Sequence, residues 1–513
     1  MTNNNSIRRE RCSLRASITP TGSFLKSAAA HFNWCSCRQS SSLARLVALV
    51  MGLATVIAYP VTAVAATTAL SAKLMDVQQR GQVIQLNSAE EISLVWEVDG
   101  DAFCSHTPTA GIENGFQFAA NRWLSSATNP APLAQGDPMT LTWSFIPDGP
   151  QGNGFNCSVP GETAGADSNL ISFLDNVHGA GPGGADLTLR PWFPIFQAAF
   201  ENWGNLNGIN YVYEPADDGA NAGFLGAPGV LGVRGDVRIG GHFLDGEVGP
   251  NVLACNFFAS NGDMIIDTGN PGFYAPFHPE NRRFRNVLEH EHGHGLSISH
   301  VCPINQSKLM EPFISLNFLG AQPDDILAAN RGYGDRDEFP NQNDTWPTAT
   351  SLGAIAIDSS VDRIQLSIDG STDQDFYSFA APANSRASIT LTPTGSTYLD
   401  GPQNLDGSCS AGTSFNSLVE NNLGVQLLGQ SGSNVLATAD SLPAGGPELI
   451  TNLSLIEGAG TYYVRVSGAQ DKAQVYNLNI ELSEGGGEPQ PPGETCSSFV
   501  LKTIDGKVVS ICL

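Results

Sequence analysis

A predicted helix that ends in a row of histidines is the feature that most constrains how this chain can fold. Helical spacing runs over about residues 281–296, and Gly295 allows the helix to end. His290 and His294 lie four residues apart, so both imidazoles lie on one helix face about a turn apart. If the chain turns after Gly295, His300 approaches the same point from another direction. We therefore expect a helix, a tight turn and three converging histidines.

Three converging imidazoles predict a zinc site with a fourth coordination position open. Glu291 follows the first histidine and lies beside the metal, where it could take a proton from zinc-bound water, whose pKa zinc lowers to roughly 7. A chance histidine-rich helix end is the alternative, but it has no need for this glutamate. His292 lies about 200 degrees around the helix from His290, so we expect it beside the site or at the surface.

The segment HEHGHGLSISH resembles the extended zinc motif of metzincin metallopeptidases, HExxHxxGxxH. The resemblance implies three zinc ligands and one general base: His290, His294 and His300, with Glu291. The family glycine falls at Ser297 in this chain. We expect this serine to need a left-handed or strained backbone, unless Gly295 moves the turn forward.

Met310, in KLMEP, is the counterpart of the methionine turn that metzincins carry beneath the zinc. The resemblance implies that it forms an apolar floor under the ligands and does not bind the metal. The sequence EPF follows it, so the tyrosine found there in some metzincin families has no counterpart. The predicted helix around Phe196–Trp203, the strand DVRIG and the segment GDMIID occupy the places where matrixin-like members carry their first helix and edge strands, so residues 137–335 resemble those members. This similarity implies that a peptide substrate binds as an added antiparallel strand beside the strand that precedes the active-site helix.

Strand patterns surround the helix and then replace helical spacing altogether. Met139 to Ile146 alternates as a strand should, and residues 147–188 look like a long irregular insertion. Beyond the polar stretch 334–348, short strand-like runs recur between turn residues. We expect an α+β chain: a metzincin-like catalytic domain, with a twisted mixed sheet and the active-site helix, followed by an antiparallel β-sandwich.

Residues 341–482 resemble the bacterial pre-peptidase C-terminal domain, a β-sandwich appended to many secreted peptidases. The resemblance rests on the segments NDTWPTATSL, DQDFYSF and TYYVRVSG, at 343–352, 373–379 and 461–468. It implies a module that aids secretion or substrate attachment, with removal on maturation as an open alternative, and with no catalytic constellation.

Calcium is a second candidate metal because several aspartates lie at strand ends and in loops. Asp373 and Asp375 could bind Ca²⁺ or could cap the strand that Phe376 and Tyr377 anchor in the core. Four more carboxylates in the first domain could bind calcium, although surface carboxylates are the simpler interpretation: Asp236, Asp245, Asp263 and Asp267.

The chain of 513 residues is longer than one hydrophobic core normally serves. Its start has the pattern of an export signal: arginines, an apolar run too short for a confident span, and Ala63-Val64-Ala65, with cleavage near Ala65-Ala66. An uncleaved anchor is the alternative. We predict five segments: a signal peptide with a long n-region (1–66), an N-terminal extension or propeptide (67–136), a zinc metallopeptidase domain (137–335), the sandwich (341–482), and a linker with a cysteine-bracketed tail (483–513).

The formal net charge is −25, which disfavours nucleic acid as a partner because phosphates would be repelled. We expect no stable membrane insertion once the signal is cleaved. Export favours disulfides among the seven cysteines after the leader. Cys255 and Cys302 could pair across the site, and Cys496 and Cys512 could close the tail.

These features predict a secreted zinc-dependent endopeptidase that hydrolyses peptide bonds of extracellular proteins, so its partners would be protein or peptide substrates. One alternative is a non-enzymatic secreted adhesin or binding protein with a degenerate zinc domain. Another is a zinc hydrolase of non-peptide substrates. The intact Glu291 argues against the first, and the peptidase-type module argues against the second. Cleavage specificity and oligomeric state stay open.

Overall fold

The structure is a computed structural model. It describes residues 122–130, 132–150, 156–157, 159–163, 165–223, 226–246, 252–404 and 407–485, and the backbone of 499–504 and 507–512. All of them belong to one compact unit, residues 77–513. The predictions of a signal peptide, of an extension up to residue 121, of a linker from residue 486 and of a Cys496–Cys512 pair lie outside the described residues.

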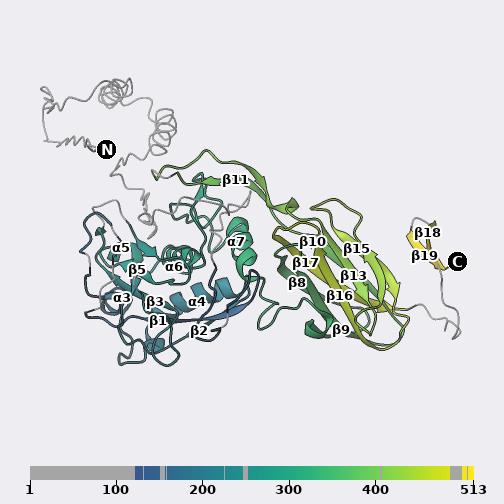
Figure 1. The fold of residues 1–513 in the computed structure, drawn as a ribbon, viewed down its shortest axis with the longest axis horizontal. Coiled ribbons are helices and arrows are strands. Elements are labelled where there is room, and N and C mark those ends of the chain that lie inside the picture. Colours follow the sequence, from purple (N-terminus) through teal and green to yellow (C-terminus); the bar gives the residue numbers. More distant parts are fainter. Residues whose placement is uncertain are drawn as a thin grey trace, which may run out of the picture. The chain divides into compact units, whose positions relative to one another are not determined.

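The first half of the described chain is built on a five-stranded mixed sheet with the order β2-β1-β3-β5-β4 (Figure 1). Four strands run parallel, and the edge strand β4 is antiparallel to β5. The strands are β1 (Met139–Phe145), β2 (Ile209–Tyr213), β3 (Val237–His242), β4 (Ala254–Asn256) and β5 (Met264–Asp267).

Alternation along β1 explains its place in the sheet. Met139, Leu141 and Trp143 contribute to the main core together with the helices, whereas Thr142 lies buried on the other face. Helices α4 and α6 pack against each other over this sheet (Figure 1). The helices are α3 (Leu170–His178), η1 (Leu187–Leu189), α4 (Phe193–Gly204), α5 (Pro271–Tyr274), α6 (Arg282–Gly295) and α7 (Pro323–Tyr333).

The prediction that residues 147–188 form an irregular insertion is wrong in part. The segment contains α3, whose Leu170, Phe173 and Leu174 pack into the main core. The helix is short, and the stretches on both sides of it are rich in glycine and proline, so its helical spacing was not apparent in the sequence.

The second half of the described chain is built from two sheets with a core between them, as expected for a β-sandwich, and all their strand pairs are antiparallel except β7 with β9, which is parallel. One sheet has the order β15-β10-β17-β8 and the other β14-β13-β16-β9-β7. The elements are η4 (Trp346–Thr348), β7 (Thr350–Ala354), β8 (Ser359–Ile368), β9 (Gln374–Ala381), β10 (Ser385–Pro393), η5 (Ser417–Val419), β13 (Leu423–Leu428), β14 (Val435–Ala439), β15 (Glu448–Ser454), β16 (Gly460–Gly468) and β17 (Gln474–Glu484). The whole described chain is therefore α+β, with more sheet than helix.

Two smaller sheets complete the described structure. One has the order β12-β11-β6 and joins β11 (Thr397–Pro402) and β12 (Thr413–Asn416) to β6 (Val301–Cys302), which follows the histidine segment. The other pairs β18 (Phe499–Ile504) with β19 (Lys507–Cys512). No helix in the described ranges combines the length and the apolar character needed to cross a bilayer.

The predicted pairing of Cys255 with Cys302 is wrong. Cys255 in β4 bonds to Cys157, and Cys302 in β6 bonds to Cys409. Each disulfide joins residues about a hundred positions apart, so neighbouring positions in the sequence carry no signal of the partner. The second disulfide links the histidine segment to the part of the chain that holds the sandwich.

Candidate metal centre

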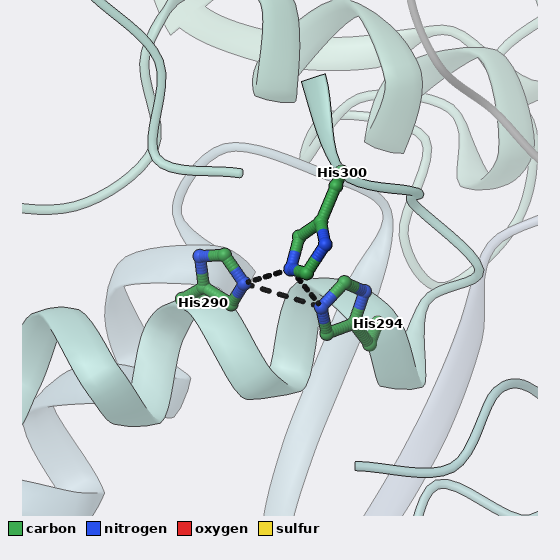
Figure 2. A group of neighbouring side chains, drawn as sticks. All are labelled: His290, His294 and His300. Carbon is green, nitrogen blue, oxygen red and sulfur yellow. Dashed lines mark hydrogen bonds between the residues drawn. The ribbon is translucent and has the colours of Figure 1, made fainter. Parts of the chain in front are cut away.

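The structure brings His290, His294 and His300 together, as the spacing predicted. Their Nε2 atoms lie 3.1, 3.3 and 3.2 Å from one another, and Figure 2 shows the three rings converging on one point. The first two come from α6 and the third from the segment after the turn. All three side chains are buried.

The outer nitrogen of each ring has its own hydrogen-bond acceptor. The Nδ1 atoms of His290, His294 and His300 lie 2.7, 2.8 and 2.9 Å from the oxygens of Leu309 (carbonyl), Ile298 (carbonyl) and Gln403 (side-chain amide). Because an amide oxygen only accepts, each Nδ1 must carry the proton and donate it. Each neutral ring then directs the lone pair of its Nε2 inward.

Three inward lone pairs at this spacing fit a metal ion. A proton could bridge only two of the three nitrogens, whereas a cation at the centre attracts all three. A tetrahedral zinc ion ~2.0–2.1 Å from each nitrogen places the nitrogens roughly 3.3 Å apart. Outer-nitrogen hydrogen bonds of this kind fix the orientation of histidines that bind metals. The donor set is therefore chemically suited to zinc.

Ser297 adopts the left-handed backbone that its position in the motif required. Its φ is +68°, its side chain is buried, and its Oγ has no hydrogen-bond partner within the described part of the chain. Its N–H donates to the carbonyl of His294 at 2.7 Å, which closes the turn that leads to His300. The serine is strained, but His300 still reaches the other two histidines.

Replacing Ser297 with glycine should stabilise the protein by about 1 kcal/mol, because a side chain in the left-handed region costs about 1–2 kcal/mol and glycine relieves it. Scanning calorimetry of the purified protein should show a melting temperature a few degrees higher. The matched control is Ser172→Gly, in the exposed face of α3, which should lower the melting temperature. A lower melting temperature for Ser297→Gly would contradict a strained turn.

Glu291 is completely buried on α6, directly after the first histidine. His292, in contrast, faces the core between α6 and β2. Its Nε2 lies 2.7 Å from the hydroxyl of Tyr211, its ring packs on Phe200, and burial lowers its pKa to about 3. His292 is therefore a neutral core residue. The alternative that His292 lies at the surface is wrong. The prediction from helix geometry that His292 points away from the other three histidines is confirmed.

Met310 packs against α6 at Gly293, which lies between the first two histidines in the sequence. A Cβ at Gly293 would overlap the sulfur of Met310, so a larger residue there would displace the end of the methionine side chain. The turn at Leu309–Met310 is held by Asp325, whose carboxylate accepts both backbone N–H groups at 2.8 and 3.0 Å. Asp325 thereby fixes the carbonyl that orients His290. In the sequence, the only sign of this role of Asp325 is its place in the first turn of α7.

The four aspartates of the first half that were candidates for calcium are all buried, so the surface interpretation is wrong. They accept hydrogen bonds that fix turns. Asp267, for example, accepts from the backbone of Leu244, Gly246 and Gly269 at 2.8 Å each. Asp236 accepts from the backbone and hydroxyl of Thr142 at 2.9 and 2.7 Å.

A second group of potential metal ligands consists of acidic side chains from both halves of the described chain. Asp335, Glu338 and Asp375 form one set, and Glu338, Asp369 and Asp373 another, with the candidate oxygens of each set within 4.8 Å of one another. We call these five residues the acidic cluster. All five are buried. Burial raises the pKa of Asp335 and of Asp369 to about 7, and that of Asp375 well above its ordinary value.

Two oxygens of the acidic cluster, Oδ1 of Asp373 and Oδ1 of Asp375, have no hydrogen-bond partner among the described residues, and the same holds for the amide oxygen of Asn343, whose backbone pairs with Phe376 beside Asp375. Asp375 is completely buried, and its other oxygen accepts from Tyr476 at 2.6 Å. Asn343 is also buried, and its backbone carbonyl accepts from the N–H of Phe376. Buried oxygens without donors are the ligands that a hard cation prefers.

No protein-family model matches this chain, and no curated protein matches it. Among solved structures, the pre-peptidase C-terminal domain of a collagenase from Bacillus anthracis is 12% identical and covers 26% of this chain and 96% of its own, with a TM-score of 0.17. Aeromonas hydrophila PliG, a periplasmic inhibitor of g-type lysozyme, is 10% identical and covers 26% and 99%, with a TM-score of 0.15. Myroilysin is 12% identical and covers 39% and 54%, with a TM-score of 0.15.

Proposed function

We propose that this protein is a secreted zinc-dependent endopeptidase with a metzincin-like catalytic domain. The observation that carries the proposal is the convergence of three inward Nε2 atoms at 3.1–3.3 Å, with a buried glutamate on the same helix. His290, His294 and His300 would hold the zinc. Bound there, zinc supplies a Lewis acid that makes water nucleophilic at neutral pH and polarises a carbonyl.

Glu291 would move the proton during hydrolysis. Its carboxylate takes a proton from the water that attacks the scissile carbonyl carbon, and then delivers it to the leaving amine nitrogen as the C–N bond breaks. A histidine-only site that held zinc for structure would not need an ionisable side chain buried beside it. The presence of Glu291 at this place therefore favours hydrolysis over a purely structural or adhesive role.

The edge of the five-stranded sheet offers a place for the peptide. The expectation that the peptide adds to the strand preceding the active-site helix is wrong, because that strand, β5, is already paired on both sides with β3 and β4. Its neighbour β4 lies at the edge of the sheet and against α6. A peptide could add to β4 as a further strand through main-chain hydrogen bonds, which would place a carbonyl near the histidines with little dependence on side-chain identity. Protein and peptide substrates are consistent with this arrangement.

Cleavage of casein or gelatin by the purified full-length protein tests the function. We expect cleavage by the zinc-loaded protein, its loss after treatment with a chelator, and its return when zinc is added back. If the protein binds zinc tightly but cleaves neither substrate nor any member of a peptide library, the peptidase proposal fails. A secreted zinc-binding adhesin would then be the better account.

We also propose that the acidic cluster binds calcium. The cluster joins Asp335 and Glu338, which precede the sandwich, to carboxylates from the loop before β9 and from β9 itself. Burial raises the pKa of Asp369 and outweighs the lowering by Arg331 and Arg122, and Arg363 pairs with Asp337 at 2.8 Å. Five buried carboxylates cannot all ionise together without a further cation. Carboxylate and amide oxygens are the ligands that Ca²⁺ prefers.

Calcium should therefore raise the melting temperature, and more at pH 8 than at pH 5. The pKa values of Asp335 and Asp369 are raised to about 7, so the folded state binds extra protons. Without a cation, the stability that these groups provide below about pH 4 is lost as the pH rises through about 7. Calcium at a hundred times its Kd should restore about 2.7 kcal/mol.

Melting of the zinc-loaded protein with and without 100-fold excess calcium measures this effect. Asp373→Asn should abolish the response to calcium. Asp362→Asn, an exposed change on β8, should keep it. Equal responses in the two variants would show that calcium acts elsewhere.

A further inference from the structure

An extension of the sandwich reaches the candidate metal centre. It leaves the sandwich after β10, runs through β11 and β12, and returns at β13; we call residues 397–416 the arm. Within the arm, β11 pairs with β6, so that Gly401 lies opposite Cys302 and Pro402 opposite Val301. The disulfide between Cys302 and Cys409, whose Cα atoms are 5.3 Å apart, fastens the arm at the same place. β6 begins at the residue after His300.

The arm is held at two further points. The amine of Lys308 donates to the carbonyl of Leu399 at 3.0 Å, and the hydroxyl of Tyr398 donates to Asp324 in α7 at 2.8 Å. Lys308 and Asp324 are both buried. These contacts lie on either side of the turn that carries Met310. The arm is therefore anchored on the elements that surround the histidines, and its strand pairing leaves little freedom in its position.

Gln403 is the residue of the arm that meets a histidine. Its amide oxygen accepts from Nδ1 of His300 at 2.9 Å, and its amide nitrogen donates to the carbonyl of Gly407 at 3.0 Å. The second bond fixes which end of the amide faces the ring. Gln403 also forms a β-bridge with Cys409, so the disulfide at Cys409 also restrains the backbone of Gln403.

The three histidines differ in which part of the chain supplies the hydrogen-bond acceptor for their Nδ1 atoms. His290 and His294 donate to backbone carbonyls at Leu309 and Ile298, within the first half of the described chain. His300 alone donates to a side chain that comes from a position 103 residues later. Its tautomer and ring orientation therefore depend on an element that the sandwich supplies.

We propose that Gln403 is a positioning residue for His300, and that the arm of the sandwich module completes the metal site. The module therefore contributes to the metal site, and its removal would weaken metal binding. This inference rests on the proposed metal site but not on the proposed peptidase activity. Hydrogen bonds to the outer nitrogens of metal-binding histidines contribute 10- to 100-fold to metal affinity or activity, which sets the size of the expected effect.

Zinc affinity of the full-length protein, measured by competition with a chromophoric chelator, tests the proposal. Gln403→Ala should weaken zinc binding by about 10- to 100-fold. Gln403→Glu should restore it, because a carboxylate accepts the same proton from Nδ1. Asn404→Ala is the matched control: Asn404 is the next residue of the arm, it is exposed, and among the described residues its side chain bonds only to Ser408. This control should bind zinc like the wild type.

The visible absorption of the cobalt-substituted protein adds a readout that a change in folding alone would not produce. Gln403→Ala should alter the cobalt band while the melting temperature of the metal-free protein stays unchanged, and Gln403→Glu should recover the band. Zinc affinity of Gln403→Ala within about twofold of the wild type would overturn the proposal. Wild-type protein that binds zinc but cleaves no peptide would overturn the proposed function and leave this test intact.

Discussion

Replacing Glu291 with glutamine is expected to lower kcat for peptide cleavage by roughly 10²- to 10⁴-fold, which is the usual contribution of a general acid–base group. Glutamine has nearly the same shape as glutamate but cannot accept the proton of the attacking water. The side chain is completely buried on α6 beside the first histidine, so bulk solvent is a poor substitute. Zinc content should stay at the wild-type level.

The matched control is Glu289→Gln, the same change at an equally buried position of the same helix. Glu289 accepts from Asn202 at 2.6 Å and pairs with Arg285 at 3.2 Å, so its role is to hold α6 against α4. A glutamine oxygen keeps the first of these bonds, and we expect this variant to retain most of its activity. Activity of Glu291→Gln above a tenth of the wild-type value would remove Glu291 from the chemistry.

Replacing His300 with alanine should lower zinc affinity on the order of 10²- to 10³-fold. Four-ligand zinc sites bind with about 10–16 kcal/mol, so one ligand contributes roughly 3 kcal/mol, or about two factors of ten. Metal analysis after dialysis against a weak chelator should find little zinc in this variant. The control is His292→Ala, which removes a histidine from the same segment but not from the converging group.

His292→Ala should keep its zinc even though the loss of packing against Phe200 and Tyr211 makes it less stable. Full zinc content in His300→Ala would show that the third ligand lies elsewhere. If both variants are equally stable and both lose zinc, zinc binding depends on the overall fold of the segment and does not identify His300 as a ligand.

Local features of the site could be predicted from the sequence because helix geometry is local. The four-residue spacing of His290 and His294 is enough to place both rings on one face, and the same geometry separates His292 from them. The left-handed backbone of Ser297 followed from the position at which the motif carries glycine. The strand MTLTWSF and the helix around Phe196 to Trp203 were predictable for the same reason, since the apolar residues recur at every second position in the strand and with helical spacing in the helix.

Features that depend on distant parts of the chain could not be predicted. The partner of Cys302 is Cys409, 107 residues further along, and the acceptor for His300 is Gln403, in a loop with no distinguishing pattern. The burial of Asp236 and Asp267 was hidden because a carboxylate that caps backbone N–H groups and one that lies in water look alike in a sequence. Strand pairing between β6 and β11 brings these residues together, and it is a property of the fold.

X-ray diffraction from crystals of the purified full-length protein, recorded on both sides of the zinc absorption edge, would locate the metal. We expect one strong anomalous peak at the point where the three Nε2 atoms converge, about 2.0–2.1 Å from each nitrogen. A zinc-loaded crystal that shows no peak there, or a peak held by other residues, would contradict the proposed zinc site.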